Sequence, residues 1–152
     1  MTVSSTKVFP DYFEQTAIDK IYAYGGNNCI KVYRVAKLGE NNNDAFLNYY
    51  DETIKGYKVF PPAIKEKKLE KYKKDMNCLS ISCYYEKKDI EDYFNYTLKD
   101  EFPRRILLEG VTCPAFGLSQ KTAERNSKYI NSSHTDWWLY KDSKPWLVFK
   151  EA

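Results

Sequence analysis

Apolar residues recur at helical spacing in three stretches of the chain, and each stretch ends at a glycine or a proline. In the first, Asp11 precedes Glu14 by three positions, which is the spacing of a capping box. The expected helices lie between Asp11 and Gly25, between the asparagine run 41–43 and Gly56, and over residues 87–99, before Pro103. The faces that they are expected to bury are Phe13, Ala17, Ile21 and Tyr24; Phe46, Tyr49, Tyr50 and Ile54; and Ile90, Tyr93, Phe94, Thr97 and Leu98.

Alternating apolar and polar residues predict strands between these helices. The expected strands cover residues 29–36, 78–84, 105–111, 132–140 and 146–150. Gly110, inside the third strand, predicts a bulge or a close approach of another segment. Residues 112–131 are the least regular part, with a short helix expected over 117–124. The interleaved elements predict an α+β fold: a single domain over residues 1–152, with a mixed or antiparallel sheet core flanked by short amphipathic helices.

The strand expected over residues 132–140 carries the richest side-chain chemistry. It holds His134, the only histidine, a carboxylate two positions later, and two of the three tryptophans. Alternation places His134, Asp136 and Trp138 on one face and Trp137 on the other. We expect one tryptophan in the core and the other partly exposed or lining a pocket. A neighbouring carboxylate raises a histidine's affinity for a proton, so His134 and Asp136 are candidates for catalysis or for a structural hydrogen bond.

Three short motifs stand in an order that resembles a known family. They are Val32-Tyr33-Arg34-Val35, then Leu79-Ser80-Ile81-Ser82 before the helix over 87–99, and His134-Thr135-Asp136 before residues 137–149. This order resembles the Arg–Ser–Glu branch of the ADP-ribosyltransferase fold over roughly residues 30 to 150. That family carries an arginine on an early strand, a Ser-Thr-Ser-type strand followed by a helix, and Gln/Glu-x-Glu on a late strand.

The resemblance implies cleavage of the nicotinamide–ribose bond of NAD, with NAD as the expected cofactor and substrate. Asp136 would stabilise the positive charge of an oxocarbenium-like transition state, and His134 would lie near the acceptor. Arg34 would bind the pyrophosphate, because its planar group donates hydrogen bonds in pairs. Ser80 or Ser82 would orient the carboxylate or a ribose hydroxyl, and Trp138 would line the cofactor site.

The departures from the family pattern leave catalytic activity open. Asp136 is one methylene shorter than the family's glutamate, His134 replaces its Gln or Glu, and Ile81 interrupts the Ser-Thr-Ser motif. Because catalysis depends on position at the ångström scale, the fold could persist without transferase activity. Each residue also has a structural interpretation: Arg34 as an edge or ion-pair residue, and the two serines as polar residues that meet solvent or neighbouring backbone.

Composition and charge narrow the remaining possibilities. The 24 basic and 21 acidic residues leave a net charge of +3, which permits nucleic-acid contact without predicting it. No run approaches the length of a membrane span, and residues 1–7 lack the apolar stretch of a secretion signal, so we expect a cytoplasmic protein without membrane contact. With one histidine and no paired cysteine spacing, no metal is predicted, and the four cysteines are expected to be free thiols.

Two other function classes stay open. The first is a non-enzymatic interaction or inhibitor module, of phage or mobile-element type, that binds a larger protein through exposed tyrosines, an outward tryptophan and residues 112–131. The second is a nucleic-acid accessory protein that uses Arg104, Arg105 and residues 65–74, where six lysines accompany two glutamates. That lysine run is otherwise a solvated helix or loop. Serine or cysteine hydrolase chemistry ranks below these classes, because no nucleophile has a recognisable elbow or a histidine at a motif spacing.

Overall fold

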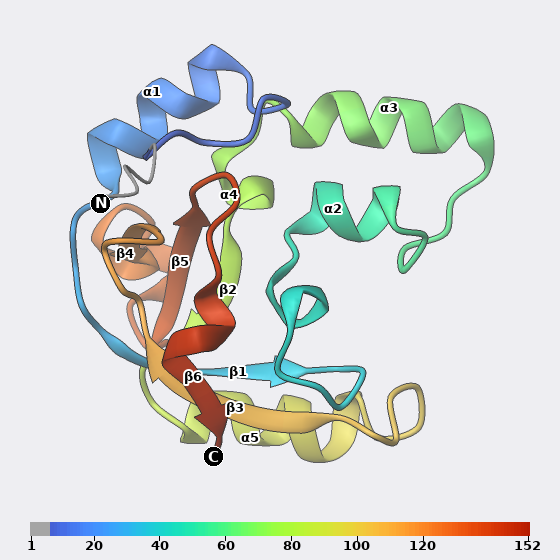
Figure 1. Cartoon of the computed structure of the whole chain (residues 1–152), viewed down its shortest axis with the longest axis vertical. Coiled ribbons are helices and arrows are strands. Elements are labelled where there is room, and N and C mark those ends of the chain that lie inside the picture. Colours follow the sequence, from blue (N-terminus) through green and yellow to red (C-terminus); the bar gives the residue numbers. More distant parts are fainter. Residues whose placement is uncertain (1–6) are drawn as a thin grey trace, which may run out of the picture.

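The computed structural model describes residues 7–152 and confirms an α+β fold built on one antiparallel sheet. The strand order is β4-β5-β2-β1-β3-β6 (Figure 1). The strands are β1 (Lys31–Ala36), β2 (Ile81–Tyr84), β3 (Ile106–Val111), β4 (Gly117–Lys121), β5 (His134–Leu139) and β6 (Phe149–Glu151). Residues 1–6, on which the expected lack of a secretion signal partly depends, lie outside the described residues.

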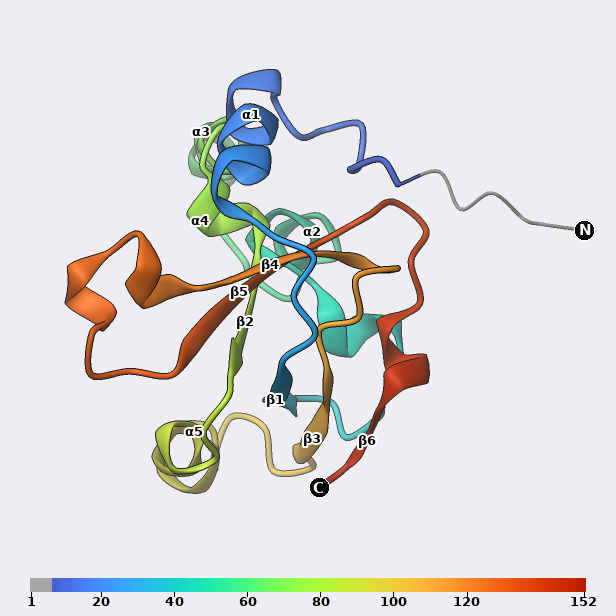
Figure 2. The ribbon, with the colours of Figure 1, turned by 90° about the vertical axis from the view of Figure 1, so that its left-hand side faces the viewer.

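Short helices gather at two ends of the molecule. The α-helices are α1 (Gln15–Tyr24), α2 (Tyr49–Ile54), α3 (Pro62–Tyr72), α4 (Met76–Leu79) and α5 (Lys88–Asp92), and α5 continues as the π-helix η2 (Tyr93–Thr97). The 3-10 turns are η1 (Asn43–Phe46), η3 (Thr122–Glu124), η4 (Ser127–Tyr129) and η5 (Pro145–Val148). Both views place α1, α3 and α4 at one end and α5 at the other (Figures 1 and 2). No helix in the described part is long and apolar enough to cross a membrane.

The alternation predicted for residues 132–140 is confirmed in β5. Trp138 packs with α1 against Ile21 on one face, whereas Trp137 packs with Val32 and Phe149 on the other. Both tryptophans are fully buried, so the expectation that one is partly exposed is wrong. The physical reason is that both faces of the sheet are covered at β5, because α1 lies over one face and η1 and η5 over the other.

The helix predicted after residues 41–43 is broken into two pieces. The first piece, η1, ends at Phe46, and Asn48 caps α2 by accepting a hydrogen bond at Oδ1 from Asp51 N (2.9 Å). Of the predicted buried face, Phe46 is buried, but Tyr49 and Ile54 are exposed. The break could not be predicted from the sequence, because an asparagine can be either a polar residue inside a helix or the residue that caps one.

The boundaries of three further elements differ from the sequence prediction. The strand expected over 78–84 is shortened to Ile81–Tyr84, because Asp75 caps the short helix α4 in front of it. Residues 117–121 form β4 instead of a helix, because every residue of β4 pairs with a residue of β5. The strand expected over 146–150 begins only at Phe149, after the η5 turn. Gly110 is confirmed as a close approach, since an added Cβ would overlap the ring of Phe149.

The sheet opens between its two central strands. β1 and β3 pair along six positions, but β1 and β2 pair only through Tyr33 and Tyr84. Beyond that pair the side chain of Arg34 connects the two strands, since it extends from β1 and donates to Ser82 O in β2 and to Ala45 O in η1. This opening brings β1, β2 and the start of α2 around a common hollow, where the candidate site lies.

Candidate functional site

Arg34 crosses the opening between β1 and β2 and joins three segments. Its Nε donates to Ala45 O and its Nη1 to Ser82 O, both at 2.6 Å, and Nη2 lies 3.4 Å from Leu47 O. A guanidinium has five N–H donors, so these contacts leave two for a ligand. Arg34 pairs with no carboxylate in residues 7–152, and its charge is balanced only by main-chain carbonyl dipoles.

A cavity of about 340 Å³, here called the Arg34 cavity, opens beside this guanidinium. Both acids that line it are neutralised: Glu52 lies 3.6 Å from Lys37, and Asp44 lies 2.7 Å from Lys55. Hydrogen bonding to Lys55 lowers the pKa of Asp44. The cavity therefore carries one uncompensated positive charge, that of Arg34. Lys37, the partner of Glu52, also lines the cavity. Its other lining residues are Val35, Ala45, Leu47, Asn48, Tyr49, Asn77, Ser80, Ile81, Ser82, Tyr84, Ile90 and Tyr93.

Asp136 lies behind this cavity, only 2% exposed, and three groups hold its carboxylate. Ser80 Oγ donates to Oδ1 at 2.6 Å, and Thr122 Oγ1 donates to Oδ2 at 2.8 Å. Arg125 Nη1 forms an ion pair with Oδ2 at 2.7 Å, and the guanidinium of Arg125 stacks over the Trp138 ring. Ser80 is the side chain that links Asp136 to the Arg34 cavity.

His134 reaches Asp136 through Thr122 instead of directly. Its Nδ1 lies 2.6 Å from Thr122 Oγ1, and its Nε2 lies 2.9 Å from Ser82 Oγ. Burial lowers the pKa of His134; the charge of Asp136 opposes this shift and that of Arg125 adds to it. Asp136 therefore raises the proton affinity of His134, as expected, but desolvation of the ring outweighs this contribution and the pKa of His134 is lowered.

The structure brings some of the predicted site residues together and separates others. Arg34, Ser80 and Ser82 line one cavity, as their neighbouring strands allow. His134 and Asp136 are joined to it through Ser82 and Ser80. Trp138 does not line this cavity; it is fully buried in the α1 cluster and donates from Nε1 to Met76 O at 2.8 Å.

Thr122 and Arg125 belong to the site but were not among the residues predicted from the sequence. Both follow β4, in the segment that projects to one side of the sheet and is orange in Figure 2. The buried acid on β5 was the only sequence signal for them, since a buried carboxylate needs donors and a cation.

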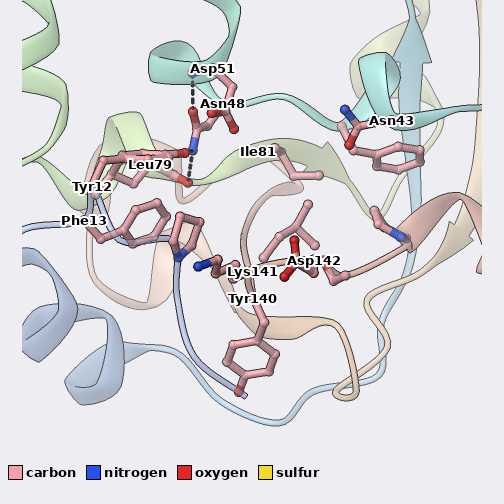
Figure 3. A pocket seen from close by; sticks show the side chains of 15 residues that line it. Tyr12, Phe13, Asn43, Asn48, Asp51, Leu79, Ile81, Tyr140, Lys141 and Asp142 are labelled. Carbon is pink, nitrogen blue, oxygen red and sulfur yellow. Dashed lines mark hydrogen bonds between the residues drawn. The ribbon is translucent and has the colours of Figure 1, made fainter. Parts of the chain in front are cut away.

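A second cavity, of about 260 Å³, lies on the other side of Asn48 (Figure 3). Asn48 Nδ2 donates to Tyr12 Oη at 2.9 Å and to Leu79 O at 3.2 Å. Burial raises the pKa of both Tyr12 and Asp51, which lie together on its wall. Lys141 and Asp142 border the same hollow (Figure 3). None of the residues predicted for the NAD site lines this second cavity.

Within residues 7–152, no group of three or more His, Cys, Asp or Glu side chains is placed to hold a metal ion. No family model matches the chain, and no curated protein or solved structure matches it either.

Proposed function

We propose that the protein is ADP-ribosyltransferase-like and binds NAD, or its product ADP-ribose, in the Arg34 cavity. The observation that carries the proposal is the placement of Arg34: a guanidinium without a carboxylate partner in the described chain, in a cavity shared with Ser80 and Ser82. These are the residues that the resemblance assigns to NAD.

Charge favours an anionic ligand in this cavity. The lysine partners of Glu52 and Asp44 cancel the negative charge of the walls, so Arg34 attracts an anion without competition from these acids. One N–H donor remains on Nη1 and one on Nη2, and both can donate to phosphate oxygens. A pyrophosphate supplies two adjacent groups of this kind.

The remaining walls suit the sugar and ring portions of the ligand. The hydroxyls of Ser80 and Ser82 are available to ribose hydroxyls as acceptors, and Tyr49 and Tyr93 are partly exposed aromatic surfaces for a base or nicotinamide ring. The volume of about 340 Å³ lies within the usual range of small-molecule sites.

Asp136 acts in this proposal through Ser80, and not on the ligand. Its carboxylate is buried and bound to Ser80, Thr122 and Arg125, so its charge reaches the cavity mainly by orienting the Ser80 hydroxyl. NAD binding is accordingly the primary expectation. Release of nicotinamide is expected to be slow, because within residues 7–152 both carboxylates that line the cavity are paired with lysines.

Calorimetric titration with NAD and with ADP-ribose tests the proposal. We expect saturable binding that Arg34→Gln weakens by at least about tenfold, because a charge-assisted hydrogen bond contributes about 1.5–3 kcal/mol. Tyr49→Ala should also weaken binding, because it removes an aromatic surface of the cavity. Arg104→Ala, at an exposed arginine outside the cavity, is the matched control. Nicotinamide release measured in the same samples reports transfer or hydrolysis. Lack of binding by the folded wild-type protein would refute the proposal.

A protein-binding module is the second candidate, and one surface favours it. Four apolar residues that are each at least 46% exposed follow one another from the end of α2 to the first turn of α3: Ile54, Tyr57, Val59 (86% exposed) and Ile64. Exposed apolar patches are typical of protein-binding sites. This candidate predicts that Val59→Glu removes a stoichiometric partner recovered with the wild-type protein, while NAD has no effect on that recovery.

A further inference from the structure

Ser82 and His134 form a hydrogen-bonded pair that NAD binding does not require. Ser82 Oγ is exposed in the Arg34 cavity and lies 2.9 Å from His134 Nε2, although 52 positions separate the two residues in the chain. The pairing of Ser82 with Asp136 and of Tyr84 with His134 between β2 and β5 makes them diagonal neighbours on one face of the sheet.

The hydrogen-bond pattern assigns the proton positions along this chain of groups. Thr122 donates its single hydroxyl proton to Asp136 Oδ2 at 2.8 Å, so at 2.6 Å it accepts from the Nδ1–H of His134. The neutral imidazole then has its lone pair at Nε2, directed at Ser82 Oγ. A serine nucleophile is activated by a base that a third group orients, and here Thr122 and Asp136 supply that third group.

The surroundings hold the imidazole in this orientation. The ring lies edge-on to Tyr84, with centroids 5.3 Å apart, and against Tyr129, with centroids 5.0 Å apart. Burial lowers the pKa of His134, which keeps its Nε2 free to accept a proton near neutral pH. The same cavity wall carries the Arg34 guanidinium, a cation for an oxyanion that forms near Ser82.

We propose that Ser82 is an activated nucleophile that takes the acyl group of small carboxylic esters, with His134 as the general base and Thr122 and Asp136 as positioning residues. Ser82 Oγ bonds to the ester carbonyl carbon while its proton passes to His134 Nε2. The carbon–alkoxide bond then breaks, and the alcohol leaves with that proton. Water, deprotonated by His134, attacks the acyl-Ser82 ester; the acid departs and Ser82 recovers its proton.

Covalent labelling with a fluorophosphonate tests this proposal on the full chain. Ser82 Oγ displaces fluoride from phosphorus, and intact mass followed by peptide mapping locates the adduct. We expect one adduct, at Ser82, on the wild-type protein and none on Ser82→Ala. His134→Gln should slow labelling by about 100-fold or more, as loss of a general base does. Ser127→Ala, at another exposed serine, should label like the wild type. The rate of p-nitrophenyl acetate hydrolysis should change in the same way: unchanged in Ser127→Ala, slowed in His134→Gln and abolished in Ser82→Ala.

Ser82→Cys provides a second measurement that does not depend on phosphorus chemistry. We expect iodoacetamide to alkylate the introduced thiol faster than Cys29, the exposed native cysteine, and we expect His134→Gln in that background to remove the difference. Any of three results would overturn the proposal. The wild-type protein could take no label, the adduct could still form on Ser82→Ala, or His134→Gln could leave the labelling rate of a folded protein unchanged. The result of the NAD titration is independent of these labelling experiments, because neither of them contains NAD.

Discussion

Replacing Arg125 by methionine should destabilise the whole fold. Arg125 and Asp136 form an ion pair at 2.7 Å, and their side chains are only 7% and 3% exposed. Methionine keeps much of the length of the arginine stem but removes the guanidinium, which leaves the Asp136 carboxylate with two hydroxyl donors and no cation. It also removes the donors that Gln120 Oε1 and Asn77 Oδ1 accept from.

Removal of one partner of a buried ion pair typically costs about 3–5 kcal/mol, because the other charge stays buried without compensation. For a domain of this size each kcal/mol lowers the Tm by about 2–4 °C. Arg125→Met should therefore lower the Tm by roughly 10 °C. Combining it with Asp136→Asn should cost less than the sum of the two single changes, by about 2 kcal/mol.

Urea denaturation followed by tryptophan fluorescence measures each free energy of unfolding in this double-mutant cycle. Lys88→Met is the control, because Lys88 forms a surface pair with Glu86 at 3.1 Å and the two side chains are 76% and 47% exposed. Such pairs contribute about 0–1 kcal/mol. A loss below about 1 kcal/mol for Arg125→Met, or strict additivity in the cycle, would show that Arg125 does not compensate the buried acid.

Two further predictions concern the neighbours of this ion pair. Trp137 and Trp138 are both fully buried, but Trp138 Nε1 donates to a main-chain carbonyl, whereas Trp137 Nε1 has no hydrogen-bond partner within residues 7–152. Trp138→Phe should therefore cost about 1–2 kcal/mol more than Trp137→Phe in urea denaturation, and equal losses would contradict the assigned bond. The second prediction concerns pH. Because burial lowers the pKa of His134 in the folded state, the unfolded chain binds a proton first as the pH falls. Stability should fall from pH 7 through the ordinary value of 6.5 toward the lowered pKa, and His134→Gln should flatten this slope in denaturation curves measured from pH 5 to 8. An unchanged slope in that variant would show that His134 does not cause the loss of stability. Asp51 cannot cause it either, because burial raises the pKa of Asp51, and a raised carboxyl pKa favours the folded state as the pH falls.

Local pattern was enough to locate much of the architecture. The strands near residues 29–36, 105–111 and 132–140 were predicted because alternation over five or six residues is a property of the strand itself. Gly56, with φ of 82°, ends α2 as predicted, since that backbone conformation favours glycine. β4 was mistaken for a helix because its strand state comes from pairing with β5, more than ten residues away.

The candidate site was also only partly predictable from the sequence. His134 and Asp136 could be chosen as candidates from residue type and strand alternation, whereas Arg34, Ser80 and Ser82 were chosen from the resemblance of their short motifs to a known family. Their partners could not, because hydrogen bonds between distant segments depend on strand register. Nothing local distinguishes Thr122 from any other threonine, yet it stands between His134 and Asp136.

Residue pattern alone determined that this chain forms an α+β fold with an acid and a histidine on one face of a strand, because alternation and turn chemistry act over a few neighbouring residues. Tertiary structure decided what those groups do. It buried Asp136 against Arg125, placed Ser82 at His134, and opened the sheet where Arg34 crosses it. Burial and distance set the charge and proton position of each group, and both are properties of the packed sheet and not of any single segment.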